Sequence, residues 1–171
     1  MNTKLAIGIF GMALIALTSC DKDGKSGEMS ASRNGEEWQT ESREGEMEKE
    51  DNLVNEGKML EITGTSSDGS SLTIQAWDPL SALNGDCITL GSVNVSALSQ
   101  TGLTTNGYCT YVNSQNEVYT SIDGGEIDFD ECVSDELSIS GSFNCTLVNP
   151  NNNDTVVFTN GRFEAITYVI L

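Results

Sequence analysis

The feature that most constrains the fold is a strict alternation of apolar and polar side chains along residues 137–147. One set consists of Leu137, Ile139, Gly141, Phe143, Cys145 and Leu147, and the residues between them are Ser, Asn and Thr. Successive side chains of a β-strand point to opposite faces of its sheet. The alternation therefore predicts a strand with one face in the core and the other in water.

Similar short runs follow one another along the rest of the chain, separated by segments rich in Gly, Asn, Ser and Asp. These runs are 59–63, 71–77, 87–90, 108–112, 117–121, 125–130, 136–148 and 154–171. No segment has a convincing helical period. The pattern predicts an all-β domain, an antiparallel β-sandwich of about eight strands, with a small β-barrel as the alternative.

The N-terminus has the composition of a secretory signal. A basic start at 1–4 precedes the apolar run 5–16, which is shorter than the roughly 20 residues that a spanning helix needs. The next four residues, Leu-Thr-Ser-Cys at 17–20, resemble the bacterial lipobox. This resemblance implies a signal peptide at 1–19, cleavage between Ser19 and Cys20, and a lipid on Cys20. The alternative is an ordinary signal peptide with an incidental cysteine.

The domain organisation follows from this start. Residues 20–33 are predicted to be a lipidated flexible tether and 34–171 the β-sandwich domain, with an acidic loop at about 41–57. Trp38 is expected in the first strand of the domain, with its side chain in the core; the alternative is a lone tryptophan in a linker. Acidic residues directly after Cys20 resemble the export signals of surface lipoproteins in Bacteroidota. We therefore expect a protein held on the bacterial outer membrane by its lipid alone and facing the cell surface; the alternative is the periplasmic face.

Charge and composition exclude several functions. The chain of 171 residues has 8 Lys and Arg against 26 Asp and Glu, a formal net charge of −18, and no histidine. A polyanion such as a nucleic acid would be repelled, and histidine-based catalysis and metal binding are absent. We expect no nucleic-acid partner, no enzymatic activity and no cofactor, apart from one candidate calcium site.

That candidate is an acidic run with a glycine turn. Asp123, Glu126, Asp128 and Asp130 lie close together in sequence, and Ca²⁺ binds several carboxylate and carbonyl oxygens. The spacing is not that of an EF-hand loop. The alternative is a solvated outer strand face, because Glu126, Asp128 and Asp130 would point the same way on a strand.

Two further residues are candidates for recognition or modification. Trp77 ends a predicted strand and is a candidate for stacking on a sugar ring; the alternative is packing at the edge of the core. Asp154-Thr155-Val156 resembles the O-glycosylation sequon of Bacteroidota, which implies a glycan on Thr155.

Four cysteines remain after Cys20, namely Cys87, Cys109, Cys132 and Cys145. A signal peptide sends the chain to an oxidising compartment, where an even number suggests two disulfides. The alternative is four reduced, buried thiols.

The pairing can be argued from strand geometry. If 125–130 and 136–147 form a hairpin, Cys132 lies at its turn and Cys145 lies roughly 40 Å along the strand. Bridged Cα atoms must lie within about 7 Å, so these two are not partners. A meander brings the start of strand 108–112 to the end of strand 137–147. We therefore predict Cys109–Cys145 and Cys87–Cys132.

Three short stretches resemble a family of uncharacterised Bacteroidota surface lipoproteins. They are Asn-Gly-x-x-Trp at 34–38, Leu-Ser-Ile-Ser-Gly-Ser-Phe at 137–143 and Val-Phe-Thr-Asn-Gly-Arg-Phe at 157–163. The family has Gly-x-x-Trp, Ile-Ser-Gly-Thr-Phe and Thr-Asn-Gly-x-Phe motifs. The resemblance implies a β-sandwich-like domain outside the cell and no catalytic residues.

The function expected from these observations is non-catalytic. The chain is predicted to be a lipid-anchored binding or interaction module of the cell envelope, with an unknown protein or glycan ligand. The alternatives are a structural subunit of a surface assembly and a glycan-processing accessory enzyme. Paired carboxylates are plentiful enough for glycoside hydrolysis, but aromatic side chains for a sugar platform are few.

Overall fold

The computed structural model describes residues 27–52, 55–79, 85–97 and 105–171. The described residues form nine strands and no helix. The strands are β1 (Glu28–Arg33), β2 (Glu36–Asn52), β3 (Asn55–Ser66), β4 (Ser71–Asp78), β5 (Gly91–Asn94), β6 (Asn106–Val112), β7 (Val118–Val133), β8 (Ser138–Val148) and β9 (Thr155–Ile170). A search of these same ranges finds no helix with the length and apolar character needed to cross a membrane.

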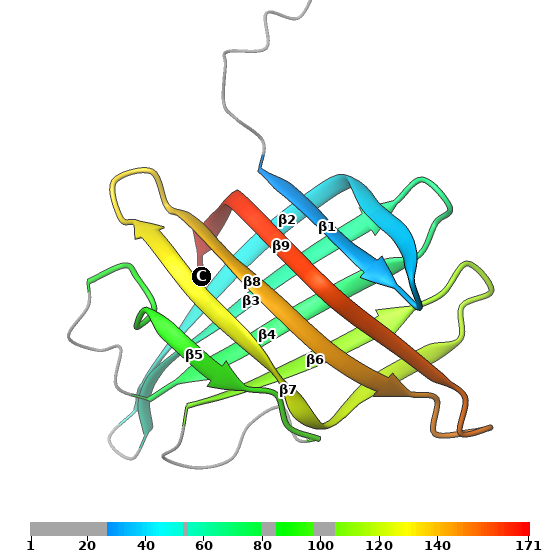
Figure 1. Ribbon diagram of the computed structural model, residues 1–171. Coiled ribbons are helices and arrows are strands. Elements are labelled where there is room, and N and C mark those ends of the chain that lie inside the picture. The colour runs from blue at the N-terminus through cyan, green and yellow to red at the C-terminus, as the bar shows by residue number, and fades with distance from the viewer. Residues whose placement is uncertain (1–26, 53–54, 80–84, 98–104) are drawn as a thin grey trace, which may run out of the picture.

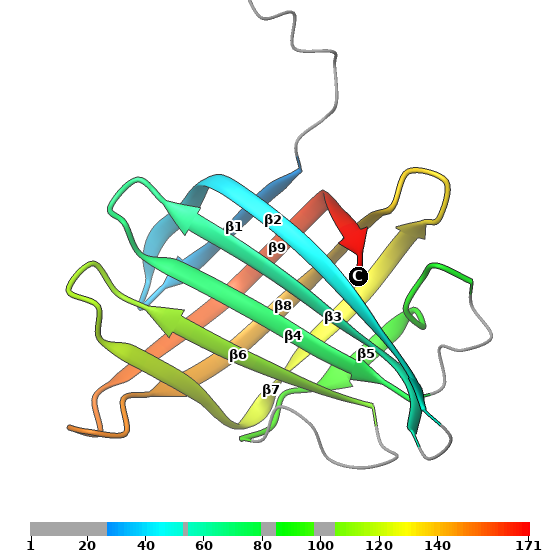
Figure 2. The same cartoon turned by 180° about the vertical axis from the view of Figure 1, so that it is seen from behind.

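The strands form one sheet that closes on itself. Their order is β5-β7-β6-β4-β3-β2-β1-β9-β8, and β8 also pairs with β7. The pairings therefore make a ring of eight strands, to which β5 is added on β7. Figure 1 shows β1, β9, β8 and the second half of β7 as one layer, and Figure 2 shows β2, β3, β4 and β6 as the other. The two layers cross steeply, as in orthogonally packed sheets.

The prediction of an all-β, sandwich-like domain is confirmed. Neighbouring strands in the ring are antiparallel, and a short parallel pairing joins Gly45–Met47 of β2 to Tyr168–Ile170 of β9. In β8 the apolar side chains Ile139, Phe143, Cys145 and Leu147 are buried, and the polar ones alternate with them. The alternation at 137–147 thus sets which face of β8 points into the core.

An aromatic cluster fills one half of the core. The ring of Phe158 lies 5.6 Å from Trp38, 5.3 Å from Tyr111 and 6.5 Å from Phe143, measured between centroids. Two of these contacts are edge-to-face, an arrangement that aromatic rings prefer. Phe158 is fully buried and joins side chains from β2, β6 and β8. It is therefore the central contact between the two layers.

Two predicted boundaries are wrong. Residues 28–33, assigned to the tether, form β1, with Met29 and Ala31 in the core. The predicted acidic loop at 41–57 instead falls within the hairpin of β2 and β3, with 41–52 in β2 and 55–57 in β3. Buried Gly45 and Met47 alternate with exposed glutamates, so this stretch has the period of a strand. The repulsion between neighbouring acids is weak there, because their side chains point into water.

Candidate functional site

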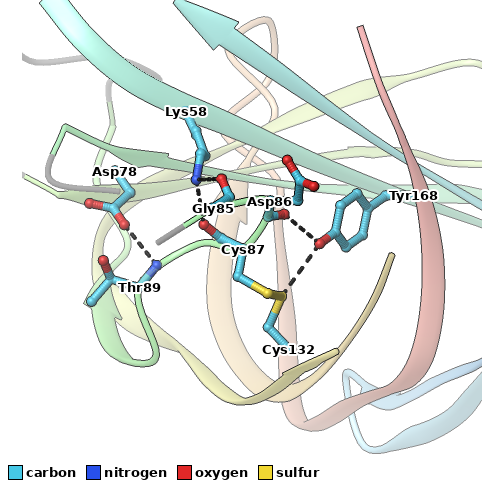
Figure 3. The surroundings of a disulfide bond; sticks show 8 residues. All are labelled: Lys58, Asp78, Gly85, Asp86, Cys87, Thr89, Cys132 and Tyr168. Carbon is cyan, nitrogen blue, oxygen red and sulfur yellow. Dashed lines mark hydrogen bonds between the residues drawn. A yellow bond between two sulfur atoms is a disulfide. The ribbon is translucent and has the colours of Figure 1, made fainter. Parts of the chain in front are cut away.

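One end of the closed sheet is blocked by the segment 85–89 (Figure 3). Cys87 forms a disulfide with Cys132 at the end of β7, with 5.9 Å between the Cα atoms. The structure thus contains this predicted bond. The neighbouring Ile88 is 2% exposed and belongs to the main core. The disulfide and Ile88 hold the segment in place as a plug.

Polar side chains at the strand ends satisfy the backbone of this plug. The ammonium of Lys58 donates hydrogen bonds to the carbonyls of Gly85 (2.6 Å) and Cys87 (2.7 Å). The carboxylate of Asp78 accepts one from the amide of Thr89 at 2.8 Å (Figure 3). Lys58 and Asp78 are buried and lie opposite each other on β3 and β4. Buried charges are tolerated where they are hydrogen-bonded, as here.

Tyr168 completes the plug from β9. Its hydroxyl donates to the carbonyl of Asp86 at 2.7 Å and lies 3.4 Å from the sulfur of Cys132. Burial, followed by the negative charge of Asp86, raises the pKa of Tyr168. The phenol therefore stays protonated and keeps donating at neutral pH.

A second polar network lies among turns at the opposite end. The guanidinium of Arg33 donates to the hydroxyl of Tyr111 (2.6 Å), the hydroxyl of Ser70 (3.2 Å) and the carboxylate of Asp68 (3.2 Å). The indole of Trp38 also donates to Ser70, at 3.0 Å. These contacts join β1, β2 and β6 to the β3–β4 turn. The network is structural, because each polar group is directed at another part of the fold.

The Asn-Gly pair at 34–35 makes the tight β1–β2 turn. Asn34 and Gly35 have φ values of 53° and 87°, as a two-residue type I′ hairpin turn requires. Asn34 also exchanges two hydrogen bonds with Val157 of β9, each 2.8 Å long. The Gly-x-x-Trp motif therefore fixes a turn and a core tryptophan, and no reactive group is involved.

Acid should weaken the Arg33 network. Hydrogen bonds from Ser70, and then the nearby Arg33, lower the pKa of Asp68 below its ordinary value of 3.8. A carboxyl group whose pKa is lowered on folding stabilises the fold at pH values above its unfolded-state pKa. This stabilisation is lost as the pH falls through the folded-state pKa. We expect Asp68→Asn to lower the melting temperature at pH 7, with a difference from wild type that shrinks below about pH 4. An equal difference at both pH values would contradict this origin.

The predicted bond between Cys109 and Cys145 is wrong for this structure, in which both thiols are free and buried. They do lie together, since a hydrogen bond with Cys145, and then burial, raise the pKa of Cys109 well above its usual range. The strands β6 and β8 are not neighbours in this part of the sheet, because β7 runs between them. The two cysteines therefore meet across the core as a thiol pair.

Thiol counting tests this arrangement. In the full chain with Cys20→Ser, we expect a maleimide to label no cysteine under native conditions, because both free thiols are buried. Denaturation without reductant should expose two thiols, and denaturation with reductant should expose four. Absence of labelling in denaturant alone would mean that Cys109 and Cys145 are bonded.

Trp77 lies at the end of β4 but is not available to a ligand. Its side chain is 3% exposed, and a Cβ added to Gly57 would lie 2.5 Å from the indole. The glycine leaves the space that the indole fills. The predicted sugar contact at Trp77 is therefore wrong, and the alternative of packing at the edge of the core agrees with its burial.

The acidic residues of the candidate calcium site are spread along β7. Glu126 and Asp128 lie on the outer face of β7, and the buried Ile127 and Phe129 alternate with them on the inner face. Asp123 lies across a register shift between Ser121 and Gly125, and its carboxylate accepts a hydrogen bond from the amide of Ala97 at 3.0 Å. In the described part of the chain, no group of three or more acidic or cysteine side chains is placed to hold a metal. The described residues thus do not gather the calcium ligands suggested by the sequence.

The remaining predicted sites are only partly visible. Thr155, the candidate glycosylation site, is exposed at the start of β9. Its accessibility suits a modification, which stays a prediction. Ser19 and Cys20, the cleavage and lipidation sites, lie outside the described residues.

The candidate functional site is a hollow of about 370 Å³ on the outer face of β8 and β9. It is lined by Ser142, Phe143, Asn144, Asn160, Gly161 and Arg162. Asn160 has a φ of 51°, and the register of β8 with β9 shifts between Phe143 and Cys145. A Cβ on Gly161 would lie 2.5 Å from the ring of Phe143, so only glycine fits there. The bulge at Asn160 and Gly161 thus shapes the hollow.

Sequence reasoning missed this hollow, although both stretches that form it contain the family motifs. The signal was present: Asn-Gly inside a strand, followed by an arginine, indicates a bulge with an adjacent cation. Arg162 is the first basic residue after Lys58 in the sequence. It is exposed beside Ser142, its partner on β8.

The fold and these sites define an acidic, disulfide-bonded β-domain with a closed antiparallel sheet and a polar hollow on its outer face. The chain matches the family described as "Domain of unknown function (DUF6252)" over residues 25–167, and it belongs to that family. Comparisons with curated proteins and with solved structures found no match. The resemblance to Bacteroidota surface lipoproteins stays a prediction beside this result.

Proposed function

We propose that this protein is a non-catalytic, lipid-anchored protein of the bacterial cell envelope that displays its β-domain as a binding module on the outer membrane surface. The proposed anchor is a lipid on Cys20, exposed by removal of residues 1–19. Two or three acyl chains hold such a protein stably to a membrane without a spanning segment. A protein or glycan outside the cell is the proposed class of ligand.

The observation that carries this proposal is the position of the hollow. One end of the domain is closed by the disulfide-bonded plug at 85–89, and the other has the Arg33 network among its turns. Large aromatic and aliphatic side chains fill the space between them. A ligand therefore meets the outer surface, where the bulge of β9 makes a polar recess.

Surface display is tested on intact cells that produce the full chain. We expect an added protease that cannot cross membranes to degrade the wild-type protein without cell lysis. The Cys20→Ser variant lacks the lipidated residue and should escape digestion. Degradation only after the outer membrane is permeabilised would place the domain on the periplasmic face and contradict surface display.

A further inference from the structure

We propose that the hollow between β8 and β9 binds a neutral, hydroxyl-rich ring, as in an uncharged oligosaccharide. This inference rests on the proposed function as a binding module and names the chemistry of its ligand. It follows from three properties of the hollow: the mixture of polar groups around it, the charges beside it, and the lack of an exposed apolar anchor.

The polar groups offer both donors and acceptors. Arg162 pairs with Ser142 across β9 and β8, and Ser142 pairs in turn with Asp128 of β7. Adjacent strands lie about 4.8 Å apart, so the backbone positions of Arg162 and Asp128 lie about 10 Å apart, with Ser142 between them. One of these residues carries a guanidinium donor and the other a carboxylate acceptor. Asn144 and Asn160 add amides that can donate and accept. A sugar hydroxyl both donates and accepts, so this arrangement suits it.

The charges around the hollow disfavour an anionic ligand. Asp128 and Glu126 flank the β8 side of the hollow, and the whole chain has a net charge of −18. Among the described residues, no side chain forms an ion pair or hydrogen bond with the guanidinium of Arg162. For a ligand that carries several negative charges, the attraction of the single cation Arg162 is weaker than the repulsion by the surrounding acids. The donors of Arg162 remain free for neutral oxygen atoms.

The hollow also lacks the features of a protein-binding hot spot. Such spots are centred on exposed aromatic or long apolar side chains that fill pockets on the partner. Phe143, the aromatic residue in the lining, is 3% exposed. The volume of about 370 Å³ is at the small end of the range for small-molecule sites, which begins near 300 Å³. A recess of this size and polarity fits one or two sugar rings better than an apolar side chain of a protein partner.

The test uses the full-length protein in detergent and matched saccharides. An array of neutral oligosaccharides is compared with uronate oligosaccharides of the same length, and each binder is then titrated by amide NMR. We expect binding of neutral members, weaker binding of their uronate counterparts, and shift changes at Ser142, Asn144 and Arg162. Replacing Arg162 with alanine should weaken binding roughly tenfold or more, as expected for lost hydrogen bonds from a charged group.

A second variant separates binding from folding. Asn160→Gly removes the amide at a position with positive φ, where glycine fits without strain, so it should weaken binding without lowering stability. Glu46→Gln, on the outer face of the other layer, is the control and should bind as wild type does. Shift changes elsewhere, preferred binding of uronates, or no binding of any neutral saccharide would overturn the inference. Surface digestion of the wild type in intact cells would still support the proposed function in each of these cases.

Discussion

Phe158→Ala is expected to destabilise the domain by about 3–5 kcal/mol, the cost of removing a buried phenylalanine ring. Phe158 is fully buried and contacts the rings of Trp38, Tyr111 and Phe143, which belong to both layers. The substitution therefore leaves a cavity where the layers meet. Urea unfolding followed by tryptophan fluorescence measures the loss as a lower midpoint, and Trp38, one of the two tryptophans, lies beside the substituted ring.

Val157→Ala is the matched control for Phe158. Val157 precedes it on the same strand, but its side chain points outward and is 37% exposed. Its truncation should change the free energy of unfolding by only about 0.5 kcal/mol or less, as for most surface positions. Equal losses for the two variants would mean that Phe158 does not have the central position that the structure gives it.

Cys132→Ala should lower stability by about 4 kcal/mol, the chain-entropy value for a bond between residues separated by 45 positions. The bond to Cys87 holds the plug at one end of the sheet, so its loss should also release Ile88 from the core. Chemical unfolding with and without reductant measures the loss of stability.

The reductant supplies the control. It should destabilise the wild type to about the level of Cys132→Ala and leave that variant unchanged, because the remaining cysteines are not bonded in the described residues. If the reductant also destabilised Cys132→Ala, a second disulfide would be present. If it left the wild type unchanged, the Cys87–Cys132 bond would not form in solution.

Much of the fold could be predicted because β-strands leave a local trace in sequence. The alternation of apolar and polar residues at 137–147 arises because one face of β8 packs in the core and the other faces solvent, as the structure shows. The Asn-Gly pair at 34–35 predicts a turn for an equally local reason, since both residues tolerate positive φ. The rise per residue of a strand excludes a bond between Cys132 and Cys145. The predicted pairing of Cys87 with Cys132 is confirmed, but its derivation also depends on a Cys109–Cys145 bond that the structure lacks.

The errors have non-local causes. The fold class itself is confirmed, but closure of the sheet depends on the pairing of β8 with β7 as well as with β9, and no single segment of sequence records that pairing. The acids at 44–48 predict a solvated loop, because their charge conceals a strand period in which only Gly45 and Met47 point into the core. Trp77 looked available because the neighbour that it packs on, Gly57, lies on another strand.

The candidate site was hidden for the same reason. Arg162 and Asn160 come from β9, and Ser142 and Asn144 come from β8. Only the register of these strands brings them together. The plug shows the same limit, because Lys58 and Asp78 are charged residues whose buried partners are backbone groups of a distant segment. From composition alone, such residues are expected to be charged groups on the surface. In the folded structure they are buried and bonded to the backbone of the plug.

The proposed anchor is tested most directly by mass spectrometry of the N-terminal peptide of the full chain, produced in a bacterium that processes lipoproteins. We predict a mature chain that begins at Cys20 and carries the added mass of a diacylglyceryl group, with or without a further acyl chain. A chain that retains residues 1–19, is cleaved at another position, or begins at Cys20 without added lipid would contradict a lipid-anchored binding module.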